Sequence, residues 1–541
     1  MAKKRGYLQT LEINRLLKRD HTLYGGVLIG LEGRTIELQS RALEAFREPQ
    51  SWVSAVSVTG MANRAVEESI DRISGAFAKY EIPKPEVRVV VNLAPADLPK
   101  DGTLLDLPLA IVMLQAAGYL PDLHETHEGN YVLLGEVGLH GEIRRVPGVL
   151  SMAYISKPGQ TLIVPAGNEK ECALIMTAPG HEGCKISAVS SLSDVIEFFK
   201  GKAKLKNALS DGVKFEEFVP ECIDFGRIKG QERAKEAALI AAAGGHNLLL
   251  IGPPGEGKSL IASAIPGIQP RLAREEMIEL TRIYSCCGLL ERDGQVITRR
   301  PMRQVHHTTS KQALVGGGSK VASPGEITLS HLGILFLDEL PEFSRSTLEA
   351  LRQPMEQGVV NISRVGVSVE YPSRFTLVAA MNPCPCGYFG SDRCRCKESE
   401  VKKYQGKISG PILDRIDLHV EVGTLSADER FQEAATPLTP DYRKRVAHAR
   451  GRQDKRFSGS KVPFNAAIPG GHVKELCAFS EEGFVAYRSC IEGNALSTRS
   501  MDRLAKVSRT VADLYNEERV QPPHVAKAAE YVVGGMLRTN F

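Results

Sequence analysis

The stretch that most constrains the fold is "LLLIGPPGEGKS", residues 248–259, in which an apolar run leads into a glycine-rich loop. Gly252, Gly257, Lys258 and Ser259 match the spacing G-x-x-x-x-G-K-[ST]. Such a loop turns its backbone N–H groups inward around phosphate oxygens, and the helix that follows adds its partial positive charge. A chance glycine-rich turn is the alternative, but the succession of strand, loop and helix favours a phosphate site at the end of a buried strand.

The chemistry expected of this loop is nucleotide binding. Lys258 reaches the β- and γ-phosphates and the Ser259 hydroxyl ligates Mg²⁺, so the sequence predicts ATP and Mg²⁺ as cofactors. The residues predicted to hold them are Gly252, Pro253, Pro254, Gly255, Glu256, Gly257, Lys258, Ser259 and Asp338.

Two further apolar runs end in residues suited to hydrolysis. "GILFLDEL" carries Asp338 and Glu339, and we expect Asp338 to hold Mg²⁺ through its shell and Glu339 to polarise the attacking water. "FTLVAAMN" ends at Asn382, whose amide is expected to hydrogen-bond the γ-phosphate or the water. The alternatives are solvated acids at a strand end and a turn-forming Asn before Pro383.

Strands and helices alternate along much of the chain, which predicts an α/β fold. At 541 residues the chain is too long for one hydrophobic core. We predict an α/β or α+β domain over residues 1–200, a polar linker at 201–218, a parallel-sheet core at 219–425 and a helical domain at 426–541.

Composition narrows the function classes. The formal net charge of +4 permits a nucleic-acid partner without demanding one, and no dense basic patch interleaved with aromatics is present. The first residues lack the apolar stretch of a secretion signal, and glycine and polar residues interrupt the richest apolar run, so no membrane span is expected. Eleven cysteines, mostly scattered, are typical of a reducing cytoplasm, and we predict a cytoplasmic protein.

Four cysteines gather in "MNPCPCGYFGSDRCRC", residues 381–396. Cys384, Cys386, Cys394 and Cys396 follow the pattern C-x-C-x₇-C-x-C. Four thiolates can surround one tetrahedral Zn²⁺, and with all four ligands supplied by protein the site would be structural. Only one residue separates the two cysteines of each pair, so the two thiolates come from positions closer along the chain than in the commoner C-x₂₋₄-C knuckle. Free buried thiols or a redox pair remain the alternatives.

Several long motifs together resemble the ComM/YifB family, which belongs to the magnesium-chelatase-related branch of AAA+ proteins. The motifs are "AAAGGHNLLLIGPPGEGKS", "PMRQVHHTTSKQALVGGGS", "GILFLDELPEF", "MNPCPCGYFG" and "SGPILDRIDLHV". The resemblance covers nearly the whole chain. It implies a ring-forming ATPase, with a hexamer as the expected size, that moves on single-stranded and branched DNA and promotes branch migration in recombination, including uptake of transforming DNA.

The resemblance also assigns two arginines. Arg415 in "LDRID" matches the arginine finger that completes a neighbouring subunit's site, and Arg499 in "LSTRSMDRL" matches the second sensor on the lid helix. A finger stabilises transition-state charge, so hydrolysis would require assembly. The alternatives are a surface arginine paired with Asp414 or Asp417, and a solvated arginine on a helix face.

Two segments are candidates for DNA contact. Residues 356–375, "EQGVVNISRVGVSVEYPSRF", predict a β-hairpin with its tip near Arg364, and in this branch of AAA+ proteins such a hairpin points into the pore of the ring. The glycine-rich segment with Lys311 and Lys320 is a second candidate pore loop, with a flexible insertion as the alternative.

The first 200 residues hold two segments, 99–111 and 138–170, that resemble the proteolytic domain of Lon-type proteases, which has a fold like ribosomal protein S5 domain 2. Where that family has its catalytic serine and lysine, this chain has Leu104 and Leu150. Neither side chain can act as nucleophile or base, so the dyad chemistry is absent. A packing role and a DNA-guiding role both stay open for this domain.

Three functions follow from these patterns. An ATP-driven DNA translocase or helicase is favoured, because the cysteine cluster and the Lon-like first domain match the ComM/YifB pattern, whereas the chelatase motor subunit normally has neither. The alternative is a magnesium-chelatase-like motor that remodels a protein partner for metal insertion. An ATP-dependent protease is disfavoured by Leu104 and Leu150.

Overall fold

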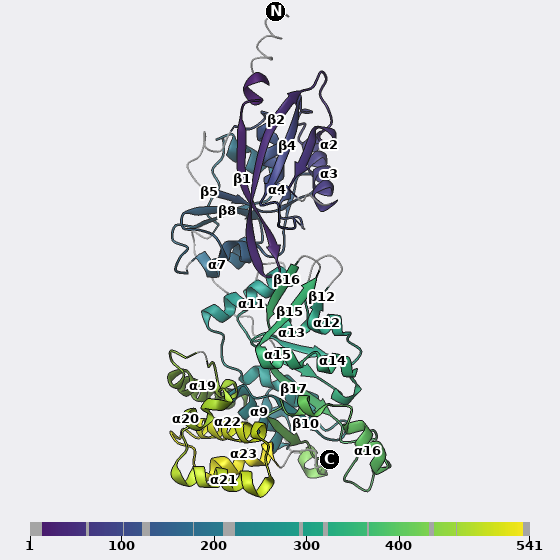
Figure 1. Ribbon diagram of the computed structural model, residues 1–541, viewed down its shortest axis with the longest axis vertical. Coiled ribbons are helices and arrows are strands. Elements are labelled where there is room, and N and C mark those ends of the chain that lie inside the picture. The colour runs from purple at the N-terminus through teal and green to yellow at the C-terminus, as the bar shows by residue number, and fades with distance from the viewer. Residues whose placement is uncertain are drawn as a thin grey trace, which may run out of the picture. The chain divides into compact units, whose positions relative to one another are not determined.

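A computed structural model describes residues 13–533, apart from 61–63, 101, 122–129, 177, 209–221, 291–295, 318–322, 365–366, 432–437 and 461. The chain forms two compact units (Figure 1). The first comprises Met1–Glu217 together with Ala273–Ile297, and the second comprises Phe218–Leu272 together with Thr298–Phe541.

The first unit is built on a seven-stranded mixed sheet of order β3-β4-β2-β1-β5-β8-β9. Strand β2 is antiparallel to β1 and β4, whereas the pairs β3–β4, β1–β5, β5–β8 and β8–β9 are parallel. The strands are β1 (Asp20–Ile29), β2 (Glu32–Ala45), β3 (Val56–Thr59), β4 (Val87–Ala94), β5 (Asn130–Leu133), β8 (Gln160–Pro165) and β9 (Lys185–Val189), with β6 (Glu136–Val137) and β7 (Ile143–Arg144) as a separate pair.

The helices of the first unit are α2 (Trp52–Ala55), α3 (Arg64–Lys79), α4 (Asp106–Ala116), α6 (Val149–Tyr154), α7 (Glu169–Met176), α8 (Leu192–Phe199) and α11 (Arg274–Cys286). Every residue of α4 is buried, as expected for a helix that is apolar nearly all round. Leu104 and Leu150 are also buried, at 4% and 0% exposure. The two positions that the resemblance to Lon-type proteases predicts to match their catalytic serine and lysine are therefore core positions.

Helix α11 lies within residues 219–425, where we expected only the nucleotide-binding core, but it packs with the first unit against α6 and α7. Gly148 N donates to the backbone and side-chain oxygens of Ser285, both at 3.1 Å. Leu280 and Ile283 are buried. Burial of this helix explains why a segment from the middle of the chain joins the first unit.

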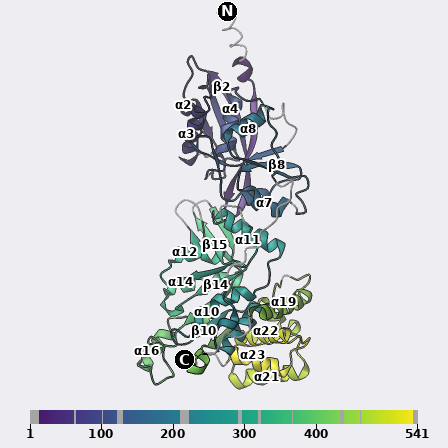
Figure 2. The same cartoon turned by 180° about the vertical axis from the view of Figure 1, so that it is seen from behind.

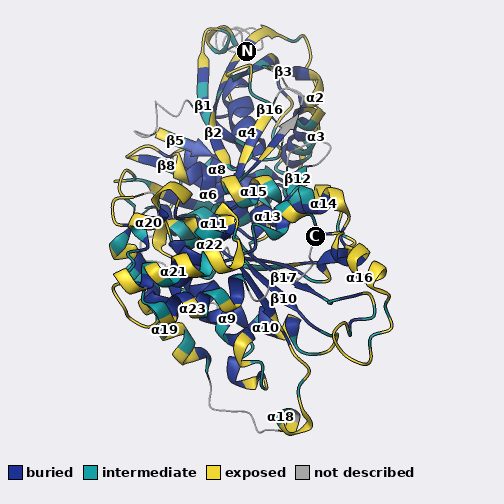
Figure 3. Ribbon diagram, turned by 60° about the horizontal axis from the view of Figure 1, so that its bottom comes forward, coloured by how far each residue is buried: buried dark blue, intermediate teal, exposed yellow. Residues whose placement is uncertain are grey.

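The second unit contains a five-stranded sheet of order β11-β14-β17-β10-β18, and each neighbouring pair in it is parallel. The strands are β10 (Leu248–Ile251), β11 (Met302–Val305), β14 (Ile334–Leu337), β17 (Thr376–Met381) and β18 (Leu418–Glu421). The three central strands are the three apolar runs of the sequence, and they are almost wholly buried (Figure 3). The predicted parallel-sheet core is confirmed. The edge strands β11 and β18 were not predicted.

Helices α9 (Glu232–Gly244) and α10 (Lys258–Ala264) border the nucleotide loop. The connections carry many short elements. These are η1 (Phe225–Arg227), η2 (Ile265–Ile268), α12 (Lys311–Val315), β12 (Gly316–Gly317), β13 (Ser323–Pro324), α13 (Glu326–Leu329), η3 (Leu340–Glu342), α14 (Arg345–Glu349), α15 (Arg352–Gln357), β15 (Val359–Arg364), β16 (Val367–Pro372), α16 (Glu398–Gln405), α17 (Gly410–Leu413) and α18 (Ala427–Phe431).

The end of the chain is helical, as predicted, and its helices gather beside α9 on the side of the second unit away from α16 (Figures 1 and 2). They are α19 (Thr439–Arg456), α20 (Val473–Leu476), α21 (Glu481–Asn494), α22 (Thr498–Leu514) and α23 (Pro522–Val532), with η4 (Asn465–Ala467) and η5 (Gly470–His472). Within the described ranges, no helix has both the length and the apolarity needed to cross a bilayer.

The segment 470–490, within the predicted helical domain, does not form one continuous helix. The structure divides it into η5, α20 and α21, because Ala478 has a left-handed φ of 50° and Ser480 caps the start of α21 by accepting from Gly483 N. A left-handed residue ends one helix, and a serine cap begins the next.

Candidate functional site

The carboxyl ends of β10, β14 and β17 bring the three predicted polar groups together. Strand β17 lies between the other two. The loop after β10 carries Lys258 and Ser259, β14 is followed by Asp338 and Glu339, and β17 by Asn382. In open α/β sheets this edge is where ligands bind.

Lys258 is the first residue of α10 and lies at the centre of the loop. Its Nζ donates to the carbonyl oxygens of Gly252 at 2.6 Å and Pro253 at 2.7 Å, and to Asn382 Oδ1 at 3.1 Å. Burial lowers the pKa of Lys258, while the nearby carboxylates of Asp338 and other acids act in the opposite direction. The ammonium group is thus held among neutral oxygens, in a place where phosphate oxygens can replace them.

The loop conformation itself depends on glycine. Gly255 and Gly257 have φ values of 81° and 89°, a left-handed backbone that other residues rarely adopt. With these turns the backbone reverses before α10 begins. The stretch Gly252–Ser259, predicted to bind the nucleotide, therefore contains the left-handed turns that a phosphate-cradling loop needs.

Ser259 and Asp338 form the pair suited to a hard divalent cation. Ser259 Oγ donates to Asp338 Oδ2 at 2.8 Å, and Asp338 Oδ1 accepts from Glu339 N at 2.9 Å. A hydroxyl and a carboxylate side by side are oxygen ligands of the type that Mg²⁺ takes next to phosphate groups. The donor set therefore fits Mg²⁺, and Ser259 and Asp338 would be its protein ligands.

Glu339 is oriented differently from its neighbour. Its backbone is left-handed, with φ 52°, and its Oε2 lies 3.0 Å from His307 Nδ1. The rings of His306 and His307 lie with their centroids 4.0 Å apart and their planes tilted by 36°. Sequence reasoning missed both histidines, although the parallel register that pairs Val305 with Leu337 places them beside the acidic pair.

The two predicted arginines are both within the second unit, and both have acidic neighbours. Arg415 pairs with Glu356, with its side chain 10% exposed, and also donates to Pro411 O. Its partner is thus neither of the acids considered from the sequence. Arg499 is 57% exposed and lies 3.8 Å from Asp414.

Asn247 connects several segments of the site, and sequence reasoning did not single it out either. Its Nδ2 donates to Arg415 O at 2.8 Å, and its Oδ1 accepts from Leu377 N at 2.8 Å. Because Asn247 directly precedes β10, one side chain joins the phosphate-loop strand, the sensor strand and the Arg415 segment. A polar residue directly before an apolar run is the signal that could have indicated such a role.

The predicted hairpin is present. Strands β15 and β16 pair antiparallel from Val359–Pro372 to Arg364–Val367, and residues 365–366 at the turn lie outside the described residues. Arg364 is the last residue of β15. Lys311 is exposed at the start of α12, and Lys320 lies outside the described residues.

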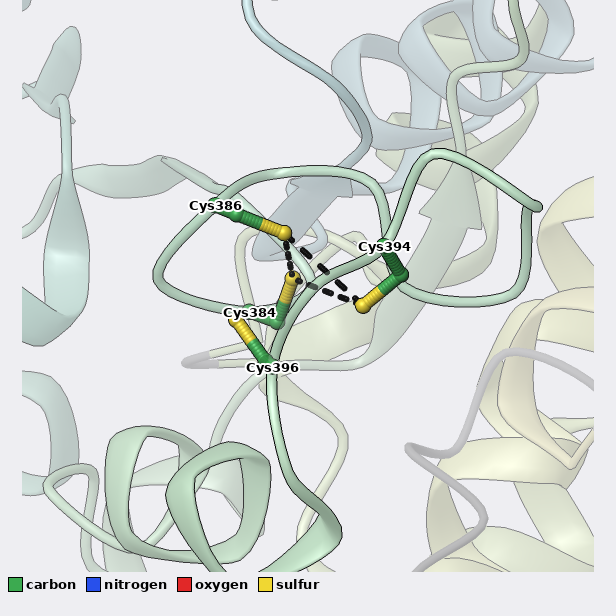
Figure 4. A group of neighbouring side chains, drawn as sticks. All are labelled: Cys384, Cys386, Cys394 and Cys396. Carbon is green, nitrogen blue, oxygen red and sulfur yellow. Dashed lines mark hydrogen bonds between the residues drawn. The ribbon is translucent and has the colours of Figure 1, made fainter.

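The four clustered cysteines converge on one point (Figure 4). Their Sγ atoms all lie within 4.8 Å of one another. The Cys384–Cys386, Cys384–Cys394 and Cys386–Cys394 sulfur distances are 3.3, 3.9 and 3.8 Å. Four thiolates at about 2.3 Å from a tetrahedral Zn²⁺ would lie about 3.8 Å apart, so the donor set fits this ion.

Comparisons with known proteins agree with this geometry. Models of the magnesium chelatase subunit ChlI match residues 49–168 and 224–430, and a model of its C-terminal part matches residues 438–532. The chain is 38% identical to the protein YifB of Escherichia coli over 88% of its own length and 91% of that protein. It is 36% identical to the competence protein ComM of Haemophilus influenzae, with the same coverage. The chain belongs to the ComM/YifB family.

This family is related to magnesium chelatase, and its core is an AAA+ domain. The magnesium-chelatase 38 kDa subunit of Cereibacter sphaeroides is 25% identical over 58% of this chain and 92% of that subunit. Membership in the ComM/YifB family indicates ATP binding with Mg²⁺ and suggests an ATPase.

Proposed function

We propose that this ComM/YifB family member is an ATP-driven, ring-forming DNA translocase or helicase that promotes branch migration in recombination and natural transformation. The observation that carries the proposal is the convergence of phosphate loop, acidic pair and sensor amide at one sheet edge, in the same unit as the β15–β16 hairpin. The name of the competence protein ComM supports a role with DNA.

Within one subunit, Lys258 would neutralise phosphate charge while Ser259 and Asp338 hold Mg²⁺. Glu339 would orient and polarise the attacking water, and Asn382 would sense the γ-phosphate. The contact of Lys258 with Asn382, at 3.1 Å, supports this assignment because it places the sensor amide beside the phosphate-binding ammonium.

Arg415 and Arg499 would complete the site in an assembled ring, for which a hexamer is the expected size. Arg415 would act in the site of a neighbouring subunit, and Arg499, on the helical lid, would act as the second sensor of the nucleotide. Since Arg415 is engaged with Glu356 in the single chain, assembly would have to exchange that carboxylate for the neighbour's phosphate.

DNA contact is proposed for Arg364, Lys311 and Lys320. The paired strands of the hairpin end at Arg364 and Val367, and Val360, Ile362, Val369 and Tyr371 are buried. A cation near the end of the hairpin would contact the phosphates of a DNA strand in the pore of the ring.

The cysteine cluster is proposed to hold a structural Zn²⁺. All four ligands are protein thiolates, so the site has no open position for chemistry. The loop that carries them leaves β17 directly after Asn382, and Zn²⁺ would therefore stiffen the connection beside the sensor.

The first unit is proposed to resemble a Lon-type proteolytic domain in fold while having no protease activity. The burial of Leu104 and Leu150 supports the second part. Packing against other subunits and guiding DNA are both compatible with its exposed surface.

The decisive experiment is strand displacement on a three-stranded DNA substrate, with ATP and Mg²⁺. The intact protein is expected to displace the strand, and Glu339→Gln, which still binds ATP, is expected not to. If the intact protein hydrolyses ATP but displaces nothing on linear or branched substrates, the translocase proposal is wrong.

The second candidate is a chelatase-like motor that remodels a protein partner for metal insertion. The match to nearly the full length of the magnesium-chelatase 38 kDa subunit favours it. ATPase rates with and without single-stranded DNA separate the two, because only the translocase should be stimulated.

A further inference from the structure

The loop that carries the four clustered cysteines, residues 384–397, also has a side that faces solvent; we call this segment the cysteine loop. Its four thiols turn inward and converge on one point (Figure 4). The side chains between and after the cysteines are mostly exposed, and those large enough to contact a partner are Phe389, Asp392, Arg393, Arg395 and Lys397. The inward side of the loop thus serves its own structure, and its outward side is left for a partner.

The outward side carries an excess of positive charge. The cysteine loop contains Arg393, Arg395 and Lys397 but only one acid, Asp392. Neither arginine side chain forms an ion pair or a hydrogen bond with any residue that the structure describes. Two exposed guanidinium groups without internal partners are well suited to bind phosphate oxygens, to which arginine donates two hydrogen bonds in parallel.

Both arginines line a hollow in the surface. The hollow has a volume of about 590 Å³, and its other lining residues are Cys386, Tyr388 and Asp392. Ligand sites in proteins measure about 300–1,000 Å³, so a flat organic group can enter a hollow of this size. Because two cations face a single carboxylate, the lining is positively charged overall, and Tyr388 adds an aromatic ring. The lining therefore favours an anion that also carries flat ring systems.

Phe389 exposes a second aromatic ring next to Tyr388 in the sequence. It is 52% exposed, and the local backbone is held firmly. Ser391 donates to the Tyr388 carbonyl oxygen through its backbone N, at 3.1 Å, and through its Oγ, at 2.8 Å. A lone exposed apolar side chain is common on protein surfaces. An exposed ring beside unpaired arginines, however, is the combination with which proteins bind single-stranded nucleic acid.

The cysteine loop also lies against the nucleotide site. Gly387 packs so closely on Pro254 of the phosphate loop that a Cβ atom added to it would come within 2.6 Å of Pro254 Cδ. The loop begins two residues after Asn382, the proposed sensor of the γ-phosphate. A partner held on the outward side of the loop would therefore be close to the residues proposed to bind ATP.

We propose that the outward side of the cysteine loop binds single-stranded DNA, with Arg393 and Arg395 on phosphates and Phe389 stacked on a base. The inference rests on the proposed translocase function and adds to it a DNA contact outside the β15–β16 hairpin. Single-stranded DNA fits better than a duplex, because a duplex stacks its bases on one another and leaves no base face for Phe389 to cover.

The test measures binding of the full-length protein to two labelled oligomers of equal length by fluorescence anisotropy. One is a thymidine oligomer, and the other has the same phosphates but abasic sites in place of the bases. Phe389→Ala should weaken binding of the thymidine oligomer about 5- to 150-fold, the factor for loss of one stacked base, and leave binding of the abasic oligomer unchanged. Phe389→Trp keeps a ring and should bind the thymidine oligomer as the wild type does.

The arginines are tested with the same oligomers over a series of salt concentrations. The double variant Arg393→Ala, Arg395→Ala should weaken binding of both oligomers, and the negative slope of log affinity against log salt concentration should become shallower by about 1.4, or 0.7 for each lost phosphate contact. The matched control is the double variant Lys444→Ala, Lys455→Ala. It removes the same charge from exposed positions of α19, on the side of the second unit away from α16, and should leave the slope unchanged.

Three results would overturn the proposal. The first is a Phe389→Ala variant that binds both oligomers as the wild type does, or weakens both equally. The second is an equal change of slope in the two double variants, which would make net charge alone the cause. The third is a set of loop variants that bind DNA normally but no longer assemble in sedimentation, which would assign the surface to a neighbouring subunit.

Two further measurements keep the test decisive. The midpoint of thermal unfolding shows whether each variant is folded, and Phe389→Leu, which keeps an apolar side chain without a ring, replaces Phe389→Ala if that variant does not fold. A wild type that binds neither oligomer would refute the proposed function, and this inference with it. A wild type that binds the thymidine oligomer while the loop variants bind it equally well would refute this inference alone.

Discussion

Both units are built on a sheet with helices, but they differ in the side chains at the positions that the sequence singled out. In the second unit, polar residues follow the buried parallel strands, and Lys258, Asp338 and Asn382 meet at one edge. In the first unit, Leu104 and Leu150, which the sequence resemblance sets at the places of the Lon-type serine and lysine, are buried in the core. A sheet with helices on it is thus a scaffold, and the side chains at a few positions decide whether it carries chemistry.

The comparison also separates two kinds of burial. Lys258 is 8% exposed and surrounded by oxygens that can be exchanged for phosphate, so its burial serves binding. Leu150 is an apolar side chain that is completely buried, so its burial serves stability. Substitutions of this kind in the second unit should therefore lower activity, whereas those in the first unit should lower stability.

The largest effect is expected from Glu339→Gln in the second unit. The amide cannot accept a proton or polarise water as the carboxylate does, and ATP hydrolysis should fall about 10²- to 10⁴-fold with the protein still folded. Glu342→Gln is the matched control, because Glu342 is an acid three residues later that pairs with Lys407. Release of phosphate at saturating ATP measures both. Equal losses in the two variants would show that the effect is not specific to the acidic pair.

Next in size is Leu150→Ala in the first unit, which should lower the free energy of unfolding by about 2–5 kcal/mol and leave ATP hydrolysis per folded molecule unchanged. Trp52, the single tryptophan of the chain, is buried in the first unit, and its fluorescence during urea unfolding follows that unit. Leu139→Ala, at a position 56% exposed, should change the midpoint little. A loss of ATPase activity without loss of stability in Leu150→Ala would give this unit a part in the reaction.

Cysteines of the two units should also behave differently. In Cys394→Ser the bound zinc should fall from about one ion per chain to nearly none, because three thiolates hold Zn²⁺ more weakly than four. Cys184→Ser in the first unit should keep its zinc, since Cys184 is remote in sequence from the cluster and contacts Ser156 and the Lys157 carbonyl instead. Metal analysis of protein purified without added zinc measures both. A wild-type protein free of metal would favour the alternatives of free thiols or a redox pair.

Much of this arrangement was predictable because it depends on short stretches of sequence. The apolar runs 248–251, 334–337 and 376–381 became strands, and the alternating pattern around Arg364 became a hairpin with Ile362 and Val369 paired on its buried face. In each case burial and periodicity within one segment determine the element.

The rest depends on partners that are distant in sequence. Strand β11 is partly exposed and reads "MRQV", so no apolar run marked it, and its place beside β14 is what brings His307 to Glu339. The pairing of Arg415 with Glu356 and the docking of α11 on the first unit are likewise set by tertiary packing. Such contacts require the sheet order, which the sequence motifs alone did not supply.

The smallest effect is expected from Arg364→Ala at the end of β15. Removal of the proposed phosphate contact should weaken binding to single-stranded DNA modestly. The negative slope of log affinity against log salt concentration should become shallower by about 0.7. Binding measured by fluorescence anisotropy over a series of salt concentrations gives that slope. Arg34→Ala in the first unit, where Arg34 is 54% exposed and paired with Glu32, is the control and should leave the slope unchanged. If Arg34→Ala lowered the slope and Arg364→Ala did not, DNA would contact the first unit rather than the hairpin. In the proposed contrast, the second unit both hydrolyses ATP and holds DNA. That contrast would then remain for hydrolysis, but the unit that holds DNA would be the first one.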